Sequence, residues 1–294
     1  MPQRDMPTMR SKRLGNELRR LRVEAGLKTQ DAADKLMCGQ PKISQIENGK
    51  RGIRQLDLKV LLDLYGVEDQ AVRDSLHRLA RSIHQVDWWS GQGPLLHDAL
   101  RDYLTLEADS SLVRAYENMV IPGLFQTERY MYEVFTGQVP DDRVEPLVST
   151  RLKRAELLSR RLDFRIRTIV DAPALHRIPG SAEVVIDQLE HLCRVGASSN
   201  VNIQVLPLKA KLPIDQIAPF SILTLAGEPS IDVAWLEHLT GGTLLERREE
   251  VLVYSRMWDE LTAAALSPAE SQRYIRDLIK EVANEPQERA VRTE

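Results

Sequence analysis

The sequence has few cysteines and no long apolar run. Its two cysteines, Cys38 and Cys193, lie far apart and fit neither a disulfide framework nor a zinc-ligand spacing, which agrees with a reducing compartment. No apolar run is long enough to span a membrane, and the start MPQRDMPTMRSKRL lacks the apolar core of a secretory signal. We therefore expect a cytoplasmic protein.

The sequence also lacks the motifs of common catalytic sites. Its six histidines show no metal-binding spacing such as HExxH, and no phosphate-binding loop or nucleophile elbow occurs. Two acid–histidine pairs, Glu190–His191 and Glu237–His238, are poor acid–base candidates because adjacent residues on a helix point apart. Asp171 ends a predicted strand, where structural carboxylates are also common. We expect no enzymatic activity, no cofactor and no metal site.

What the sequence does contain is an asymmetry of charge. A chain of 294 residues suggests two domains. Residues 1–54 hold 13 Lys+Arg against six Asp+Glu, a net charge of +7, and subtraction from the totals of 40 and 43 leaves 27 against 37, a net charge of −10, for residues 55–294. A basic module attached to an acidic remainder is typical of a phosphate-binding domain joined to a regulatory body.

The basic part contains two predicted short helices joined by a tight turn, between Lys28 and Arg51. The apolar residues that share one face of the first helix, residues 31–37, are Ala32, Ala33, Leu36 and Met37. Cys38 and Gly39 interrupt this pattern, and Pro41 suits the first turn of a second helix. That helix places Ile43 and Ile46 on its inner side.

Polar groups surround these two isoleucines. The uncharged and basic members of this surface are Gln40, Lys42, Ser44, Gln45 and Asn48, and Glu47 is its one acid. Such a face suits base edges and phosphates rather than a hydrophobic partner.

Apolar periodicity predicts the rest of the fold. Helices at residues 11–25, 56–65 and 70–83 complete a five-helix domain, and residues 95–285 mix helices with strands that alternate apolar and polar residues. The expected class is α+β, an all-α five-helix domain followed by a mixed α/β domain with a small sheet packed on helices. The predicted parts are a loose N-terminus at 1–10, a DNA-binding domain at 11–84, a junction at 85–94, a C-terminal domain at 95–285 and a loose tail at 286–294.

The segment around residues 14–81 resembles the Cro and phage-repressor type of helix-turn-helix domain, also called the Xre family. The residues that carry the resemblance are PKISQIENGKR and the following LKVLLDLYGV. The resemblance implies that the second helix of the motif enters the major groove of DNA while the first lies across the backbone.

Carried over residue by residue, the resemblance places base readout at Gln40, Pro41, Lys42 and Gln45. Glutamine can bond adenine with two hydrogen bonds and lysine favours guanine acceptors, whereas Pro41 offers only apolar contact, for example to a thymine methyl. The positions implied for phosphate contacts are Thr29, Gln30, Ser44, Asn48, Lys50 and Arg51. Lys28 stands where the family commonly has a capping threonine and Thr29 where it has glutamine, so either Thr29 or Gln30 can be the phosphate contact.

The remainder resembles a C-terminal domain without an established role that occurs in two-domain regulators of actinobacteria. The matching segments include LRDYLTLEADSSLVRAYENMVIPGLFQTERY, RLKRAELL, NVNIQVLPL, APFSILTL and DELTAAALSPAESQRYI. That family includes regulators of sporulation and antibiotic production, often encoded beside small companion proteins thought to bind them.

Together these features predict a transcriptional regulator that binds double-stranded DNA as a homodimer at an inverted repeat. The dimer is expected to be held chiefly by residues after Trp88, because one module offers only about 600–1,000 Å² of protein surface to DNA. A small companion protein bound to the C-terminal domain would control it. The alternatives are a small-molecule-responsive regulator and an antitoxin-like protein whose main task is to bind its companion.

Overall fold

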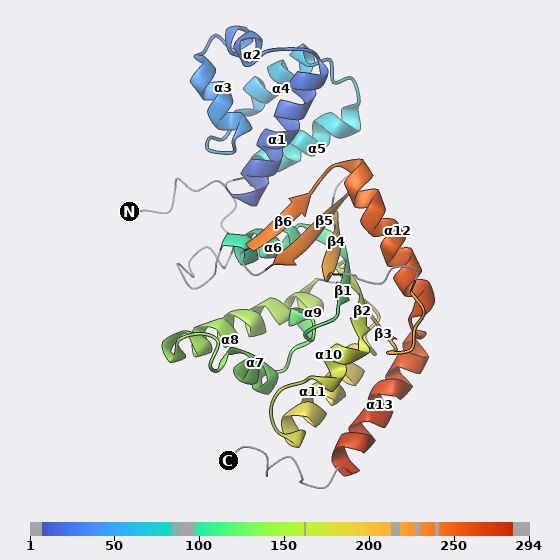
Figure 1. The fold of residues 1–294 in the computed structure, drawn as a ribbon. Coiled ribbons are helices and arrows are strands. Elements are labelled where there is room, and N and C mark those ends of the chain that lie inside the picture. The colour runs from blue at the N-terminus through green and yellow to red at the C-terminus, as the bar shows by residue number, and fades with distance from the viewer. Residues whose placement is uncertain are drawn as a thin grey trace. The chain divides into compact units, whose positions relative to one another are not determined.

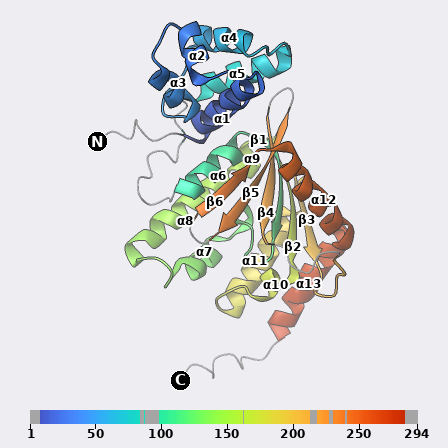
Figure 2. The ribbon, with the colours of Figure 1, turned by 45° about the horizontal axis from the view of Figure 1, so that its top comes forward.

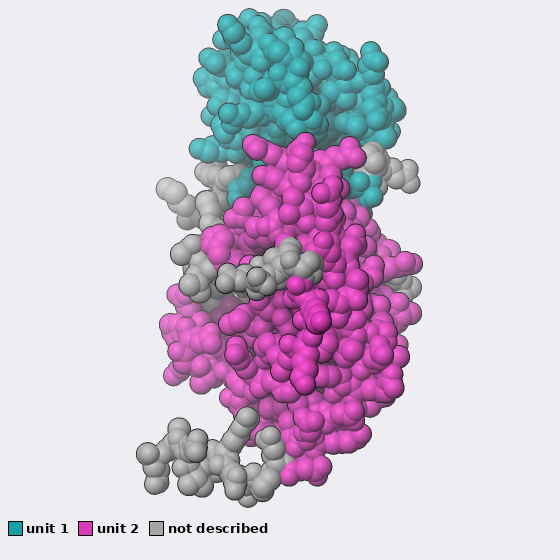
Figure 3. Space-filling model, turned by 45° about the vertical axis from the view of Figure 1, so that its right-hand side comes forward, with its two compact units in different colours: residues 1–91, 101–106, 226–231 teal, residues 92–100, 107–225, 232–294 magenta. Residues whose placement is uncertain are grey.

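The structure is a computed structural model that describes residues 8–83, 87, 98–161, 163–212, 218–226, 230–238 and 241–284 (Figure 1). The chain forms two compact units, coloured separately in Figure 3. The first unit comprises residues 1–91, 101–106 and 226–231, and the second comprises residues 92–100, 107–225 and 232–294. The predicted junction at 85–94 lies outside the described residues except for Asp87.

Five helices build the first unit, as the periodicity predicted. Their bounds are α1 Met9–Glu24, α2 Thr29–Lys35, α3 Gln40–Glu47, α4 Gln55–Leu64 and α5 Gln70–Ser82. Apolar spacing predicts four inward-facing residues in α4 and at its end, and all four are buried, namely Leu58, Leu61, Leu62 and Tyr65. They share one core with Leu14 and Leu18 of α1 and with Leu76 of α5.

Helix α1 begins two residues before the predicted start. Met9 and Arg10, predicted to be loose, belong to the helix and are buried. The Thr8 hydroxyl oxygen caps the helix by accepting a hydrogen bond from the Ser11 N–H. Arg10 donates two hydrogen bonds to the Asp87 carboxylate, at 2.7 and 3.1 Å, a long-range contact that no local pattern can reveal.

A six-stranded mixed sheet, in the order β3-β2-β1-β4-β5-β6, forms the second part of the fold. The strands are β1 Ser110–Glu117, β2 Arg165–Asp171, β3 Val201–Leu206, β4 Phe220–Leu225, β5 Ile231–His238 and β6 Gly241–Leu245. Strand β1 pairs in parallel with β2, which pairs in parallel with β3, whereas β1 with β4 and β5 with β6 are antiparallel. The mixed α/β class of this part is therefore confirmed.

Helices accompany this sheet. Their bounds are α6 Asp98–Ala108, η3 Gly123–Phe125, α7 Glu128–Phe135, α8 Asp141–Ala155, α9 Leu157–Arg160, α10 Ala172–His176, α11 Ala182–Val195, α12 Arg248–Ala264 and α13 Pro268–Asn284. Figures 1 and 2 both place α7 and α8 on one side of the sheet and α12 with α13 on the other. Trp258 and Leu261 of α12 pack in one cluster with Ile169 and Ile222 of the sheet.

Two details of this part differ from the sequence predictions. Strand β6 was not predicted, because its segment GGTLL has no alternation of apolar and polar residues. The apolar spacing of residues 140–162 predicts one long helix with Leu152 facing inward, but α8 ends at Ala155 and Leu152 is exposed. Arg151 takes the inward direction instead, with its guanidinium 4.4 Å from the centre of the Phe135 ring. Among the described helices, none is long and apolar enough to cross a membrane.

Candidate nucleic-acid interface

Helix α2 begins at Thr29, two residues before the start predicted at residue 31. Lys28 is its N-cap residue, and the Lys28 backbone N–H donates to the Asp31 carboxylate at 2.6 Å. A lysine side chain cannot accept a hydrogen bond, so only this half of a capping box is present. Thr29 is thus the first helical residue and is half-buried, whereas Gln30 is exposed.

The turn between α2 and α3 corrects one prediction. Helix α2 ends at Lys35, and Met37, predicted to lie on its buried face, is 93% exposed. Met37 has φ +48°, the left-handed conformation that ends the helical path and turns the side chain outward. Ala32 and Ala33 are buried as predicted, and the Cys38 N–H donates to the Ala33 carbonyl at 2.9 Å.

A buried ion pair anchors the end of α3 to α1. Arg22 donates to both carboxylate oxygens of Glu47, at 2.7 and 2.9 Å, and also to the Leu27 carbonyl at 2.7 Å. Arg22 falls outside the apolar stripe of α1 that contains Leu14 and Leu18, and Glu47 was predicted on the polar face of α3, yet both are only 7% exposed. Two-point pairing satisfies both charges inside the fold and fixes the angle at which α3 is presented.

Glycine allows α1 and α3 to approach this closely. A Cβ atom on Gly15 would lie 2.5 Å from the Glu47 carbonyl oxygen and 2.6 Å from that of Ile46. Past the helix end, Gly49 has φ +69°, and its carbonyl accepts a hydrogen bond from the Ser11 hydroxyl at 2.8 Å. Gly15 was not predicted to have this role, because a glycine within a helical pattern does not reveal which backbone lies against it.

The predicted base-reading residues divide into two groups. Gln40, Pro41 and Gln45 are exposed on α3, and Pro41 occupies its first turn as predicted. Lys42 is partly buried, and its Nζ pairs with the Asp57 carboxylate of α4 at 2.9 Å. Three of the four therefore present their side chains to solvent, while Lys42 is shared with a neighbouring helix.

The predicted phosphate contacts lie in α2, α3 and the turn after α3. Lys50 and Arg51 are exposed. Asn48 donates to the Ser44 carbonyl at 2.8 Å, and the Gln30 amide donates to Asp34 at 2.7 Å. The local partners of Asn48 and Gln30 are exposed, so both side chains can exchange them for a phosphate at little cost.

A fixed helix with an exposed polar face, flanked by cations, defines the helix-turn-helix class of DNA-binding domain. Residues 13–76 match the family described as a helix-turn-helix domain. Residues 100–277, more than half of the chain, match the family described as a domain of unknown function, DUF5753. The chain belongs to this DUF5753 family and carries an N-terminal helix-turn-helix domain. No curated protein and no solved structure matches it.

The second unit contains a group of mostly half-buried charges that no sequence pattern predicted. The Glu117 carboxyl at the end of β1 has a pKa raised to about 8, because burial and the nearby Glu237 disfavour its charged form. Burial, and then Arg154, lower the pKa of Arg151 to about 10. Arg151 donates a hydrogen bond to Gln126 and stacks on Phe135.

The positive charge of Arg154, which like Arg151 lies on α8, is balanced by an ion pair. The Arg154 guanidinium donates to both oxygens of the buried Glu107 carboxylate, at 2.7 and 2.6 Å. Among the described residues, no group of three or more histidine, cysteine, aspartate or glutamate side chains could hold a metal ion.

Proposed function

We propose that the chain is a sequence-specific DNA-binding transcriptional regulator of the Xre type. The observation that carries the proposal is the exposed face of α3, where Gln40, Pro41 and Gln45 project from a helix fixed by the buried Arg22–Glu47 pair. A rigidly held helix can place hydrogen-bonding groups against base edges, and cations beside it can hold phosphates. The proposal assigns no catalytic step to the chain.

The proposed regulator acts as a homodimer at an inverted repeat in the cytoplasm. One helix-turn-helix module contributes about 600–1,000 Å² of protein surface, which limits its affinity, and a two-fold dimer doubles that area. Half-sites then lie about one helical turn of DNA apart, or a multiple of it. The residues after Trp88, which include the whole DUF5753 match, are the part assigned to dimerisation.

Control of DNA binding is assigned to the second unit through a small companion protein. The motif resemblance to actinobacterial two-domain regulators supports this assignment. So does the net charge of −10 for residues 55–294, most of which form the second unit, because it suits an electrostatically complementary partner.

A second candidate is a regulator that responds to a small molecule. It is favoured by the group around Glu117 and Arg151, because buried charges with shifted pKa values are enriched at binding sites. Co-purification from the native host followed by mass spectrometry distinguishes the two. A stoichiometric small protein supports control by a partner, and a retained metabolite supports the sensor.

Selection from a random duplex library, followed by analytical ultracentrifugation of the complex, tests the main proposal. The proposal predicts enrichment of an inverted repeat and two chains per selected duplex. Recovery of unselected sequence alone would contradict specific readout. A monomer that binds single half-sites with full affinity would contradict the dimer.

A further inference from the structure

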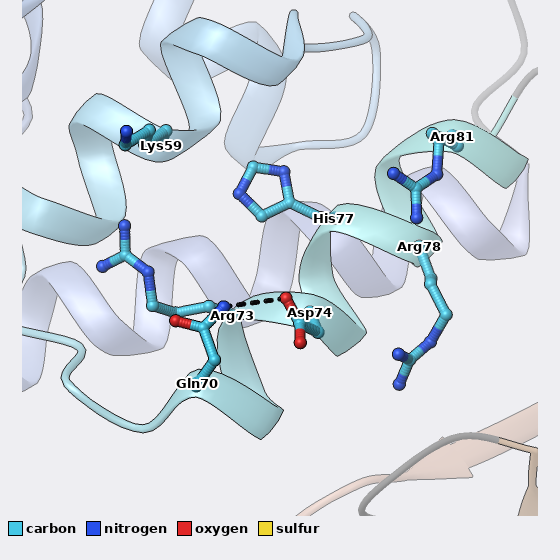
Figure 4. Close-up of a pocket in the computed structure, with 7 residues that line it drawn as sticks. All are labelled: Lys59, Gln70, Arg73, Asp74, His77, Arg78 and Arg81. Atoms are coloured by element: carbon cyan, nitrogen blue, oxygen red, sulfur yellow. Dashed lines mark hydrogen bonds between the residues drawn. The ribbon is translucent and has the colours of Figure 1, made fainter.

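The first unit has a second basic surface, away from the predicted DNA-reading helix. A hollow of about 500 Å³ lies along α4 and α5 (Figure 4). Its lining residues are Lys59, Gln70, Arg73, Asp74, His77, Arg78 and Arg81. Helix α3 packs against α1 and α2, whereas α5 packs against α1 and α4. Figures 1 and 2 accordingly show α3 and α5 apart within this unit.

Positive charge dominates this hollow. Four of its lining residues are cations and one is an acid, Asp74, whose carboxylate already accepts a hydrogen bond from the Gln70 amide at 2.9 Å. Arg73 is held by Asp63 at 2.5 Å and by the Val67 carbonyl at 2.9 Å. Within residues 8–83, Lys59 and Arg81 have no ion-pair partner, so their charges are available to a ligand.

His77 adds an oriented hydrogen-bonding group. Its Nδ1 lies 2.7 Å from the Gln55 side-chain oxygen on α4 and donates to it, so Nε2 can donate to an anion once the ring is protonated. Burial lowers the pKa of His77, and Arg73, Arg81 and Lys59 lower it further, while Asp74 opposes them. These cations disfavour one more positive charge, which is the electrostatic condition for binding an anion.

We propose that this hollow binds a small ligand bearing phosphate groups. Arginine forks and a lysine ammonium are the common ligands of phosphate oxygens, and the volume is that of a nucleotide-sized site. A concave site on α4 and α5 suits a compact anion, whereas a duplex on the exposed face of α3 is held by other residues. The ligand therefore binds independently of the DNA contact.

Calorimetric titration of the full chain with inorganic pyrophosphate, at constant ionic strength, tests this inference. We expect saturable binding of one pyrophosphate per chain. Lys59→Gln and Arg81→Gln should each weaken it about tenfold, because each removes a charge-assisted contact. Arg19→Gln, which removes an exposed cation from α1, is the matched control and should leave the affinity unchanged.

Two further measurements separate this site from alternatives. Pyrophosphate should raise the pKa of His77, followed by NMR of its ring proton, because the bound anion favours the imidazolium. A saturating duplex that carries the selected site should leave pyrophosphate binding intact. Absence of saturable binding, an equal loss in Arg19→Gln, or displacement of pyrophosphate by the duplex would each overturn the proposal.

Discussion

At the scale of single residues, the predicted interface depends on side chains that never reach DNA. Arg22 and Glu47 form a two-point ion pair at 2.7 and 2.9 Å inside the first unit, where each residue is 7% exposed. Removal of one partner leaves the other charge buried without compensation, which costs much more than the pair itself contributes. The orientation of α3 thus depends on a contact that a helical wheel does not show.

Arg22→Ala should lower the free energy of unfolding by about 3–5 kcal/mol, measured by urea denaturation. Arg20→Ala is the matched control on the same helix. Arg20 pairs with Glu17 and Glu24 at the surface, so its loss should cost less than about 1 kcal/mol. The double variant Arg22→Met/Glu47→Leu should recover most of the stability. Equal effects of Arg22→Ala and Arg20→Ala would refute the buried role.

Lys42 is predicted to divide its charge between Asp57 and DNA. The Lys42 side chain is 27% exposed and the Asp57 side chain 24% exposed. Their ion pair at 2.9 Å is therefore only moderately strong. Asp57→Asn should release the ammonium and raise DNA affinity up to about fivefold, measured by fluorescence anisotropy. Glu68→Gln controls for the loss of an acidic charge. A gain that persists in Lys42→Ala/Asp57→Asn would show that Lys42 is not involved.

Glu117 makes the stability of the second unit depend on pH. Its pKa is raised from 4.5 to about 8 in the folded chain, so the unfolded chain releases this proton first as the pH rises. The stability contributed by the protonated carboxyl is full below pH 4.5 and is lost by about pH 8.

Glu117→Gln keeps the shape of the protonated carboxyl and removes its titration. Between pH 5 and 8 the variant should lose about 1–3 kcal/mol less stability than the parent chain. Glu260→Gln, an exposed acid on α12, should follow the parent curve. Parallel unfolding curves for all three proteins across this range would contradict the buried protonated state.

At the scale of elements, apolar periodicity was sufficient wherever an element buries one clear stripe. Helix α4 shows this with its buried leucines. The sequence Ser-Pro-Ala-Glu at residues 267–270 predicts a capping box at the start of α13, and Ser267 and Glu270 are bonded reciprocally at 3.0 and 3.3 Å. These signals are local, so the sequence contains them in full.

Elements defined by long-range contacts could not be predicted. Strand β6 is an example, because it contains Gly242, whose role depends on a residue of the neighbouring strand. A Cβ atom on Gly242 would lie 1.9 Å from the Trp235 ring of β5. The glycine that weakens the strand pattern is the residue that lets this indole pack over the hairpin. In the candidate DNA interface, too, local features were predictable and long-range contacts were not. The exposed polar face of α3 was predictable, whereas the inward direction of Glu47, the outward direction of Met37 and the link from Lys42 to α4 were not.

Gly15 offers a test of how closely α1 and α3 pack. Glycine to alanine within a helix normally adds about 1 kcal/mol of stability. Gly15→Ala should instead lower the free energy of unfolding by about 1–3 kcal/mol, because the new methyl group meets two backbone carbonyls that cannot move independently. Arg19→Ala, at an exposed position of the same helix, should stay within about 0.5 kcal/mol of the parent. Stabilisation by Gly15→Ala would contradict the close approach.

At the scale of the whole molecule, one chain joins two regions of opposite net charge. The helix-turn-helix domain and the DUF5753 domain match separate families, at residues 13–76 and 100–277. Residues 1–54 carry a net charge of +7, and residues 55–294, which include α4 and α5 as well as the DUF5753 domain, carry a net charge of −10. In our account the basic part positions the chain on DNA, and the larger acidic part supplies dimerisation and control.

The most direct test of this account compares Gln40→Ala with Lys50→Ala on a panel of duplexes with single base-pair changes, at several salt concentrations. Gln40→Ala should cost about 1–3 kcal/mol on the selected site and relax the preference at one base pair, with an unchanged salt slope. Lys50→Ala should weaken all duplexes alike and reduce the salt slope by about one. Equal, sequence-independent losses in both variants would contradict base readout by α3.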